Sequence, residues 1–245
     1  MELEKEWAET AAKLADKSCK EKSSRKRQKL FANSYKKLLD RICIKDVQAV
    51  LDLGCGLGEI NGVLKNQELF VVNLDISLSS LRVAKSFYPQ SNFLCADMNN
   101  VPSKKNTFDI ITAISSLEFC FDKARILRVV KEKLKDNGRM YIEVRNNDFI
   151  VYGLMKHFFS FYKKKVFIKD YPAKDFQDLG YNEWIDLFRN SGLSVEKTYA
   201  SARPWNYGSF ETRIKNFIIM ITRYLVPLKY HYMIGFVLKK YQSKS

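Results

Sequence analysis

The stretch LDLGCGLGE, Leu51 to Glu59, constrains the fold of this 245-residue chain more than any other. It overlaps the end of an apolar run, VQAVLDL (Val47–Leu53), and carries glycines at alternate positions, Gly54, Gly56 and Gly58. A buried strand that runs into such a loop is typical of α/β proteins, whose ligands bind at the carboxyl ends of parallel strands. Because glycine has no Cβ atom, this loop is expected to meet its ligand with its backbone.

Strand and helix alternate along most of the chain after this point. Short apolar runs predict further buried strands at Leu69–Asp75, Asn92–Asp97, Phe108–Ser115, Arg139–Val144, Ser194–Ala200 and Tyr232–Leu238. Helix-start residues and helical spacing predict helices at Asn61–Lys65, after Ser77, over Asp122–Lys135 and around Trp184 up to Gly192. Continuous apolar strands that alternate with helices indicate a parallel sheet covered on both faces.

Two helix boundaries are predicted from single residues. Ser77 precedes an apolar helical pattern that includes Leu78 and Leu81, so its hydroxyl is expected to cap the helix. The pair Asn137-Gly138 follows the helix that starts at Asp122, and it is expected to stop that helix in a left-handed turn.

Composition limits the class of protein more than it limits the partner. The formal net charge of +15 favours contact with an anion such as nucleic acid, a membrane surface or a phosphorylated substrate. The five cysteines include no Cys-x-x-Cys pair, which indicates reduced thiols in a cytoplasmic protein and no zinc site. We expect no signal peptide and no transmembrane helix, since the most apolar segment, Phe217–Val226, is interrupted by Arg223.

The acids near the glycines predict the kind of ligand. A dinucleotide fingerprint would need a glycine where Glu59 stands, and a P-loop would need a Gly-Lys-Ser/Thr sequence that does not follow here. Asp52 precedes the glycines and would repel a pyrophosphate. A ligand with a positive centre suits this loop better.

Two further acids, Asp75 and Asp97, end the next two predicted strands. Since the carboxyl ends of parallel strands meet at one edge, the acids are expected to line one crevice. S-adenosylmethionine offers each a donor: the ammonium group or a water for Asp52, the ribose diol for Asp75 and the adenine amine for Asp97. Ile76 and Met98, which follow two of these acids, are expected to enclose the adenine ring between apolar walls.

Five segments in order resemble the motifs of the class I S-adenosylmethionine-dependent methyltransferases: VLDLGCGLGEI, VVNLDIS, FLCADM, FDIITAISSLEF and LKDNGRMYIEV. The resemblance covers roughly Val47–Val144, and Gly180–Tyr199 is similar to the family's penultimate helix and strand. It implies a Rossmann-like, doubly wound α/β fold with a seven-stranded sheet, helices on both faces and an antiparallel last strand beside the sixth. It implies S-adenosylmethionine as cofactor, with these contacts besides the acids and walls named above: Gly54, Cys55, Gly56, Gly58 and Ser115.

The remaining segments are expected to enclose this site. Residues 1–46 are expected to form N-terminal helices that cover the cofactor, and residues 47–245 are expected to form the methyltransferase domain. Insertions at about 146–180 and 203–230 interrupt the alternation, are rich in aromatic residues and are expected to form a lid over the acceptor.

The acceptor is less constrained than the cofactor. Many relatives have Leu-Glu-His after the fourth strand, but this chain has Leu117-Glu118-Phe119, which disfavours metal-assisted methylation of a catechol-like acceptor. We therefore predict no metal. The Asn-Pro-Pro-Tyr type signature of base and amide methyltransferases is also absent, since the corresponding stretch is Ala113-Ile114-Ser115-Ser116.

Four residues are candidates for the acceptor side. His157 and Glu118 are candidate general bases, although His157 also suits a structural place in an aromatic helix and Glu118 suits a turn. Arg145 ends the fifth strand and could pair with a substrate anion or lie on the surface. Trp205 lies in a rigid aromatic loop that suits stacking on a ring or packing of the insertion.

Three functional hypotheses follow. The favoured one is methyl transfer to a small molecule, at a hydroxyl of a sugar, polyketide-like or lipid-linked compound. The second is methylation of RNA or protein, which the basic runs Lys20–Lys29 and Lys163–Lys165 favour and the absence of an RNA-binding motif disfavours. The third is a non-catalytic protein that keeps the fold. The helix expected over Phe210–Val226 suits peripheral membrane contact or packing on its own domain.

Overall fold

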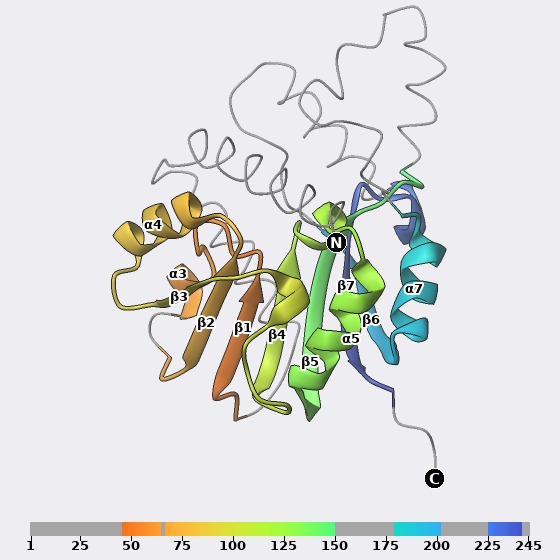
Figure 1. Ribbon diagram of the computed structural model, residues 1–245. Coiled ribbons are helices and arrows are strands. Elements are labelled where there is room, and N and C mark those ends of the chain that lie inside the picture. Colours follow the sequence, from red (N-terminus) through yellow and green to blue (C-terminus); the bar gives the residue numbers. More distant parts are fainter. Residues whose placement is uncertain (1–45, 65–66, 150–178, 202–224, 242–245) are drawn as a thin grey trace, which may run out of the picture.

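The computed structural model describes residues 46–64, 67–149, 179–201 and 225–241. These residues contain a seven-stranded sheet in the order β3-β2-β1-β4-β5-β7-β6 (Figure 1). The strands are β1 Ala49–Leu53, β2 Phe70–Asp75, β3 Asn92–Cys95, β4 Phe108–Ile114, β5 Leu134–Arg145, β6 Leu193–Ala200 and β7 Met233–Lys240. β1 to β5 pair in parallel, and β7 lies between β5 and β6, antiparallel to both. The Rossmann-like sheet with an antiparallel last strand is therefore confirmed.

Helices cover both faces of this sheet. The α-helices of the described segments are α3 Asn61–Leu64, α4 Leu78–Phe87, α5 Lys123–Lys133 and α7 Tyr181–Asn190. Short 3-10 helices lie at Met98–Asn100, Leu117–Phe119 and Leu228–Tyr230. Helices α5 and α7 lie over the face turned to the viewer in Figure 1, and α3 lies behind the sheet.

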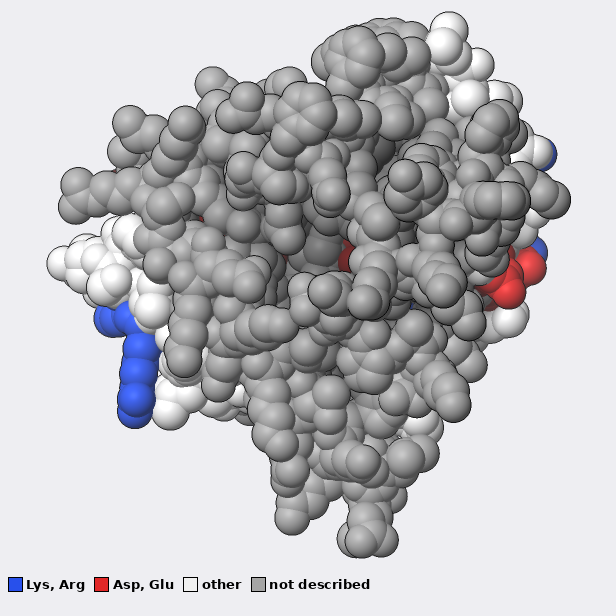
Figure 2. Space-filling view, turned by 90° about the horizontal axis from the view of Figure 1, so that it is seen from above, with Lys and Arg blue, Asp and Glu red and all other residues white. Residues whose placement is uncertain are grey.

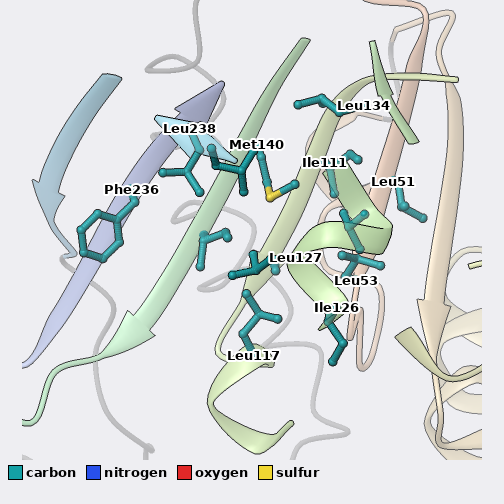
Figure 3. Packing of buried hydrophobic residues seen from close by; sticks show 14 of the residues in the cluster. Leu51, Leu53, Ile111, Leu117, Ile126, Leu127, Leu134, Met140, Phe236 and Leu238 are labelled. Carbon is teal, nitrogen blue, oxygen red and sulfur yellow. The ribbon is translucent and has the colours of Figure 1, made fainter. Parts of the chain in front are cut away.

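The larger hydrophobic core lies between the sheet and helices α5 and α7. Strand residues such as Leu51, Ile111 and Met140 pack there against Ile126 and Leu127 of α5 (Figure 3). The opposite face has a smaller core around α3, with these members: Val50, Ile60, Leu64, Val71, Ile110, Ile114, Tyr141 and Val237. Because nearly every residue of β1 is buried on one face or the other, the strand has no polar-apolar alternation, as its sequence predicts.

Two helix ends agree with their predicted signals. The Ser77 hydroxyl accepts a hydrogen bond from the Ser80 backbone N–H at 3.1 Å, which caps α4. Gly192 has a φ of +76° just after α7, in the left-handed region that ends many helices.

The predicted stop at Asn137-Gly138 is wrong. Helix α5 ends at Lys133, and β5 begins directly at Leu134, five residues before the predicted strand start at Arg139. Gly138 is not among the described glycines with positive φ. A Cβ on Gly138 would lie 2.9 Å from the carbonyl oxygen of Asp109 in β4, so the close approach of the two strands requires this glycine.

Several expected elements lie outside the described residues. They include the N-terminal helices, nearly all of the insertion at 146–180 and most of the insertion at 203–230. Within the described ranges no helix is long and apolar enough to cross a membrane.

Candidate functional site

The glycine loop turns sharply after β1. Gly54, Gly56 and Gly58 have φ angles of +66°, +55° and +70°, a region that L side chains rarely occupy. The backbone N–H groups of Gly54 and Cys55 donate to the carbonyl oxygen of Leu74 in β2, at 2.7 and 3.0 Å. The loop thus bends across the carboxyl end of the neighbouring strand.

Asp75, the last residue of β2, holds this loop in place. One carboxylate oxygen accepts a hydrogen bond from the Gly56 N–H at 2.8 Å, and the other accepts from the Ser77 N–H at 2.9 Å. The side chain is buried. Because each carboxylate oxygen has two lone pairs, Asp75 retains the capacity to accept from a ribose hydroxyl.

The floor of the loop is anionic. Asp52 is only 1% exposed, and its Oδ1 accepts a hydrogen bond from the Thr112 hydroxyl at 2.6 Å. Glu59 is also buried. Burial raises the pKa of the Cys55 thiol well above its usual value, and the carboxylates of Asp75, Asp52 and Glu59 raise this pKa further. The negative charge of these carboxylates, which disfavours a thiolate, also disfavours a bound pyrophosphate and favours a bound cation.

The third predicted acid lies at the rim of the site. Asp97 is exposed, and its Oδ1 accepts from the backbone and side-chain amides of Asn99, at 2.8 and 3.0 Å. Met98 and Ile76 are each partly buried. A Cβ on Gly54 would lie 3.0 Å from the terminal methyl of Met98, so Met98 lies against the glycine loop, as an adenine wall would require.

The acids lie at or just beyond the carboxyl ends of neighbouring strands. β3, β2 and β1 are adjacent in that order, and Asp97, Asp75 and Asp52 come from their carboxyl ends. Figure 2 views the molecule from the side to which these ends point in Figure 1, and Asp or Glu atoms are visible near its centre. The three predicted acids thus lie at the carboxyl ends of three adjacent strands.

The family described as "Methyltransferase domain" matches residues 51–142, from the middle of β1 to the middle of β5. This match shows a methyltransferase domain in residues 51–142, the region that resembles the class I S-adenosylmethionine-dependent methyltransferases. The cofactor that this family implies is S-adenosylmethionine. The residues of this domain fit that group: a backbone-lined loop, an anionic floor for the positive end and a buried acid beside the loop for the ribose.

Three relatives show how far the similarity extends. An uncharacterised protein of Methanocaldococcus jannaschii is 31% identical over 52% of this chain and 54% of the relative. A second uncharacterised protein of the same organism is 28% identical over 95% of the chain and 93% of the relative. The ubiquinone biosynthesis O-methyltransferase of Coxiella burnetii is 31% identical over 42% of the chain and 46% of the relative. The chain thus spans about half the length of the first and third of these relatives.

Solved structures share the fold over nearly the whole chain. The protein solved in complex with the Trm112 methyltransferase activator of Haloferax volcanii superposes with a TM-score of 0.63, at 16% identity, over 90% of this chain and 96% of that one. At this level of identity the similarity concerns the fold alone.

The carboxyl end of β4 carries Ser115, another residue expected to contact the cofactor. Ser115 follows β4 with a φ of +51°, which is uncommon for a residue other than glycine. Its N–H donates to the backbone carbonyl of Glu143 in β5 at 2.8 Å. Ser116 contacts the cofactor loop, because a Cβ on Gly54 would overlap with the Ser116 side chain. Strained backbone therefore lies between the cofactor loop and β5.

Two predicted acceptor residues interact with each other. The Arg145 Nε atom lies 3.8 Å from Oε1 of Glu118, and the guanidinium carbon lies 5.3 Å from the centroid of the Phe119 ring. Glu118 is 1% exposed and Arg145 is partly exposed. Two of the four residues expected on the acceptor side, Glu118 and Arg145, are therefore adjacent in the structure.

The other two predicted acceptor residues, His157 and Trp205, lie outside the described residues. The second histidine, His231, is buried, and its Nε2 lies 3.0 Å from the carbonyl oxygen of Val226. In the segments that the structure describes, no group of three or more His, Cys, Asp or Glu side chains could hold a metal ion.

Two buried polar residues of the site region were not predicted as functional. Asn73 in β2 exchanges amide hydrogen bonds with Asn61 of α3, at 2.9 and 3.2 Å, and Asn61 also donates to the carbonyl of Gly58. Glu143 is buried in β5, and its Oε2 accepts a hydrogen bond from the Tyr141 hydroxyl. The available signal was a single polar residue inside each of two apolar runs, VVNLD and MYIEV.

Proposed function

We propose that this protein transfers the methyl group of S-adenosylmethionine to a hydroxyl of a small-molecule acceptor. The observation that carries the cofactor assignment is the buried Asp75 carboxylate, which accepts from the Gly56 N–H in a loop surrounded by three carboxylates. A loop of this charge suits the sulfonium and ammonium groups of S-adenosylmethionine. Asp75 supplies the acceptor for the ribose, and Asp97 supplies one for the adenine amine.

The choice of a hydroxyl acceptor has separate support. The Coxiella burnetii relative is an O-methyltransferase by name, and its similarity covers 42% of the chain. A hydroxyl nucleophile needs a group that takes its proton, and buried carboxylates at the ends of β4 and β5 provide candidates. The acceptor must hold its nucleophile about 3 Å from the methyl carbon, in line with sulfur.

RNA or protein methylation gains no support from the described surface. Part of its positive charge is paired with acids, as in the pairs Lys135–Asp109 at 2.8 Å and Lys240–Asp136 at 2.8 Å. The basic runs at 20–29 and 163–165 lie outside the described residues.

The experiment that tests the proposal follows a labelled methyl group from S-adenosylmethionine to defined acceptors. We expect label in one or more members of a panel of alcohols, phenols and sugars, and none in RNA or in a protein extract. Label in RNA or protein alone would overturn the small-molecule assignment.

A further inference from the structure

The carboxyl group of Glu143 lies on the same face of the sheet as two of the predicted cofactor acids, Asp52 and Asp75. Asp52 pairs with Thr112 across β1 and β4, and Thr112 pairs with Tyr141 across β4 and β5. Residues paired in this way project to one face, and so does Glu143, two positions beyond Tyr141. Asn73 pairs with Asp52 and so lies on this face. Asp75 lies on it too, because it is two positions beyond Asn73 in the same strand.

Glu143 also lies at the edge of the sheet where the glycine loop begins. It pairs with Ile114, the last residue of β4, and its backbone carbonyl accepts from the Ser115 N–H. Two strand spacings, about 10 Å, separate β5 from β1. The cofactor acids run from β3 to β1, so the sulfonium end is nearest to β4 and β5 and the acceptor must lie beyond it.

The two carboxylate oxygens of Glu143 differ in their hydrogen bonding. It is 7% exposed, and its Oε2 accepts from the Tyr141 hydroxyl at 3.2 Å. The other oxygen, Oε1, is buried and has no hydrogen-bond partner among the described residues. A buried carboxylate oxygen without a donor is costly, and such groups in native proteins call for an explanation such as a ligand.

The neighbouring strand is shaped around this pair of side chains. Gly235 of β7 is the register partner of Glu143, and a Cβ on Gly235 would collide with the Tyr141 hydroxyl. The missing side chain at Gly235 therefore lets Tyr141 keep the position from which it orients Glu143. By contrast, Glu118 is engaged with Arg145.

We propose that Oε1 of Glu143 accepts a hydrogen bond from the hydroxyl nucleophile of the acceptor and takes its proton. As the hydroxyl oxygen bonds to the methyl carbon, its proton passes to Oε1, and the electron pair of the methyl–sulfur bond remains on sulfur. Glu143 ends neutral and S-adenosylhomocysteine leaves. The acceptor is therefore an alcohol or a phenol and not a carboxylate, which Glu143 would repel. This inference rests on the proposed function.

Sinefungin tests this placement without a known acceptor. In this cofactor analogue, a carbon that bears an amino group replaces the methylated sulfur, so its ammonium lies where the methyl group would be. A carboxylate that binds the nucleophile would lie about 6 Å from that ammonium, close enough to attract it strongly in a partly desolvated site. S-adenosylhomocysteine lacks the ammonium at that position.

The measurement is the ratio of the two dissociation constants, by calorimetry, in the full chain and in two variants. We expect the preference for sinefungin to fall about 10-fold in Glu143→Gln, which keeps the shape and removes the charge. The control Asp136→Asn, at an exposed acid, should leave the ratio unchanged. An equal ratio in Glu143→Gln and in the unmodified protein would overturn the role of Glu143. Failure of both compounds to bind the unmodified protein would overturn the proposed function itself.

Discussion

At the scale of single residues, the glycines of the loop differ in the space around them. A Cβ on Gly56 would meet no atom within 4 Å, although the φ of this residue is +55°. The space beside Gly56 is therefore open on the side from which a ligand would approach. The neighbouring Gly54 is different, since a Cβ there would overlap with Ser116.

Gly56→Ala should impair cofactor binding more than it impairs folding. The left-handed backbone costs an alanine about 1–2 kcal/mol, and no protein atom obstructs the methyl group. We expect the affinity for S-adenosylhomocysteine to fall at least about 30-fold, roughly 2 kcal/mol. The control is Gly192→Ala, with a φ of +76° and a Cβ that would displace only the end of the Lys131 side chain, remote from the site; it should lose stability and no affinity. Equal losses of affinity in the two variants would contradict the account.

Asp75→Asn should weaken cofactor binding while the domain stays folded. The amide keeps the shape of the side chain but replaces one acceptor oxygen with a donor, so it cannot accept from both Gly56 and a ribose diol as before. The expected loss of S-adenosylhomocysteine affinity is about 10-fold or more, with a smaller loss for Asp97→Asn at the exposed rim. Calorimetry gives the affinities and thermal unfolding reports the fold. Unchanged affinity in Asp75→Asn would remove the ribose from this position.

At the scale of elements, helix α3 is tied to the sheet by side-chain amides. Asn61 and Asn73 exchange two hydrogen bonds, and Asn73 donates as well to the carbonyl of Asn92 at 2.9 Å, at the start of β3. Since Asn61 also donates to the carbonyl of Gly58 at 2.8 Å, this amide pair links the end of the glycine loop to two strands.

Asn73→Leu should loosen the glycine loop, although residue 73 lies in β2 and not in the loop. The variant leaves the buried Asn61 amide without its partner, which costs about 1–3 kcal/mol of the free energy of unfolding. We expect faster amide hydrogen exchange at Gly58 and Asn61 and weaker binding of S-adenosylhomocysteine. Exchange rates at these amides equal to those of the unmodified protein would show that the pair does not hold the loop.

At the scale of the whole molecule, ion pairs make stability depend on pH. The hydrogen bond from Arg139 lowers the pKa of Glu196 below its usual value. Burial alone would raise the pKa of Asp109, but Lys135 and the backbone N–H groups of Ala49 and Gln48 outweigh it and lower the pKa. In the unfolded chain the pKa is about 4.3 for Glu and about 3.9 for Asp. A carboxyl group whose pKa is lower in the folded protein stabilises the fold above its unfolded pKa. This stabilisation is lost as the pH falls through the pKa of the folded state.

Glu196→Gln should therefore be less stable than the unmodified protein at pH 7 and nearly as stable at pH 3. A loss of about 0.5–1 kcal/mol at pH 7 is expected for this partly exposed pair. Urea unfolding at the two pH values measures the difference. Asp186→Asn, in an exposed pair with Arg189, should change little at either pH. A stability loss in Glu196→Gln that is the same at both pH values would contradict the assignment.

The sequence predicted the described fold well because its signals are local. Apolar runs locate all seven strands, and Ser77 and Gly192 mark helix ends by their own chemistry. The prediction at Gly138 was wrong because the glycine serves a contact with β4, which only the tertiary structure creates. The acids expected to bind the cofactor were selected because each lies at or just beyond the end of a predicted strand. Glu143 was not, because its significance depends on Tyr141 and on the register with Gly235.

The central claim is that the glycine loop and its acids bind S-adenosylmethionine and not a dinucleotide. Calorimetric titration of the protein with S-adenosylhomocysteine, with NAD in a parallel titration, tests it most directly. The account predicts binding of S-adenosylhomocysteine with a dissociation constant on the order of micromolar, about −8 kcal/mol, and no binding of NAD. Binding of NAD alone, or of neither compound, would contradict it.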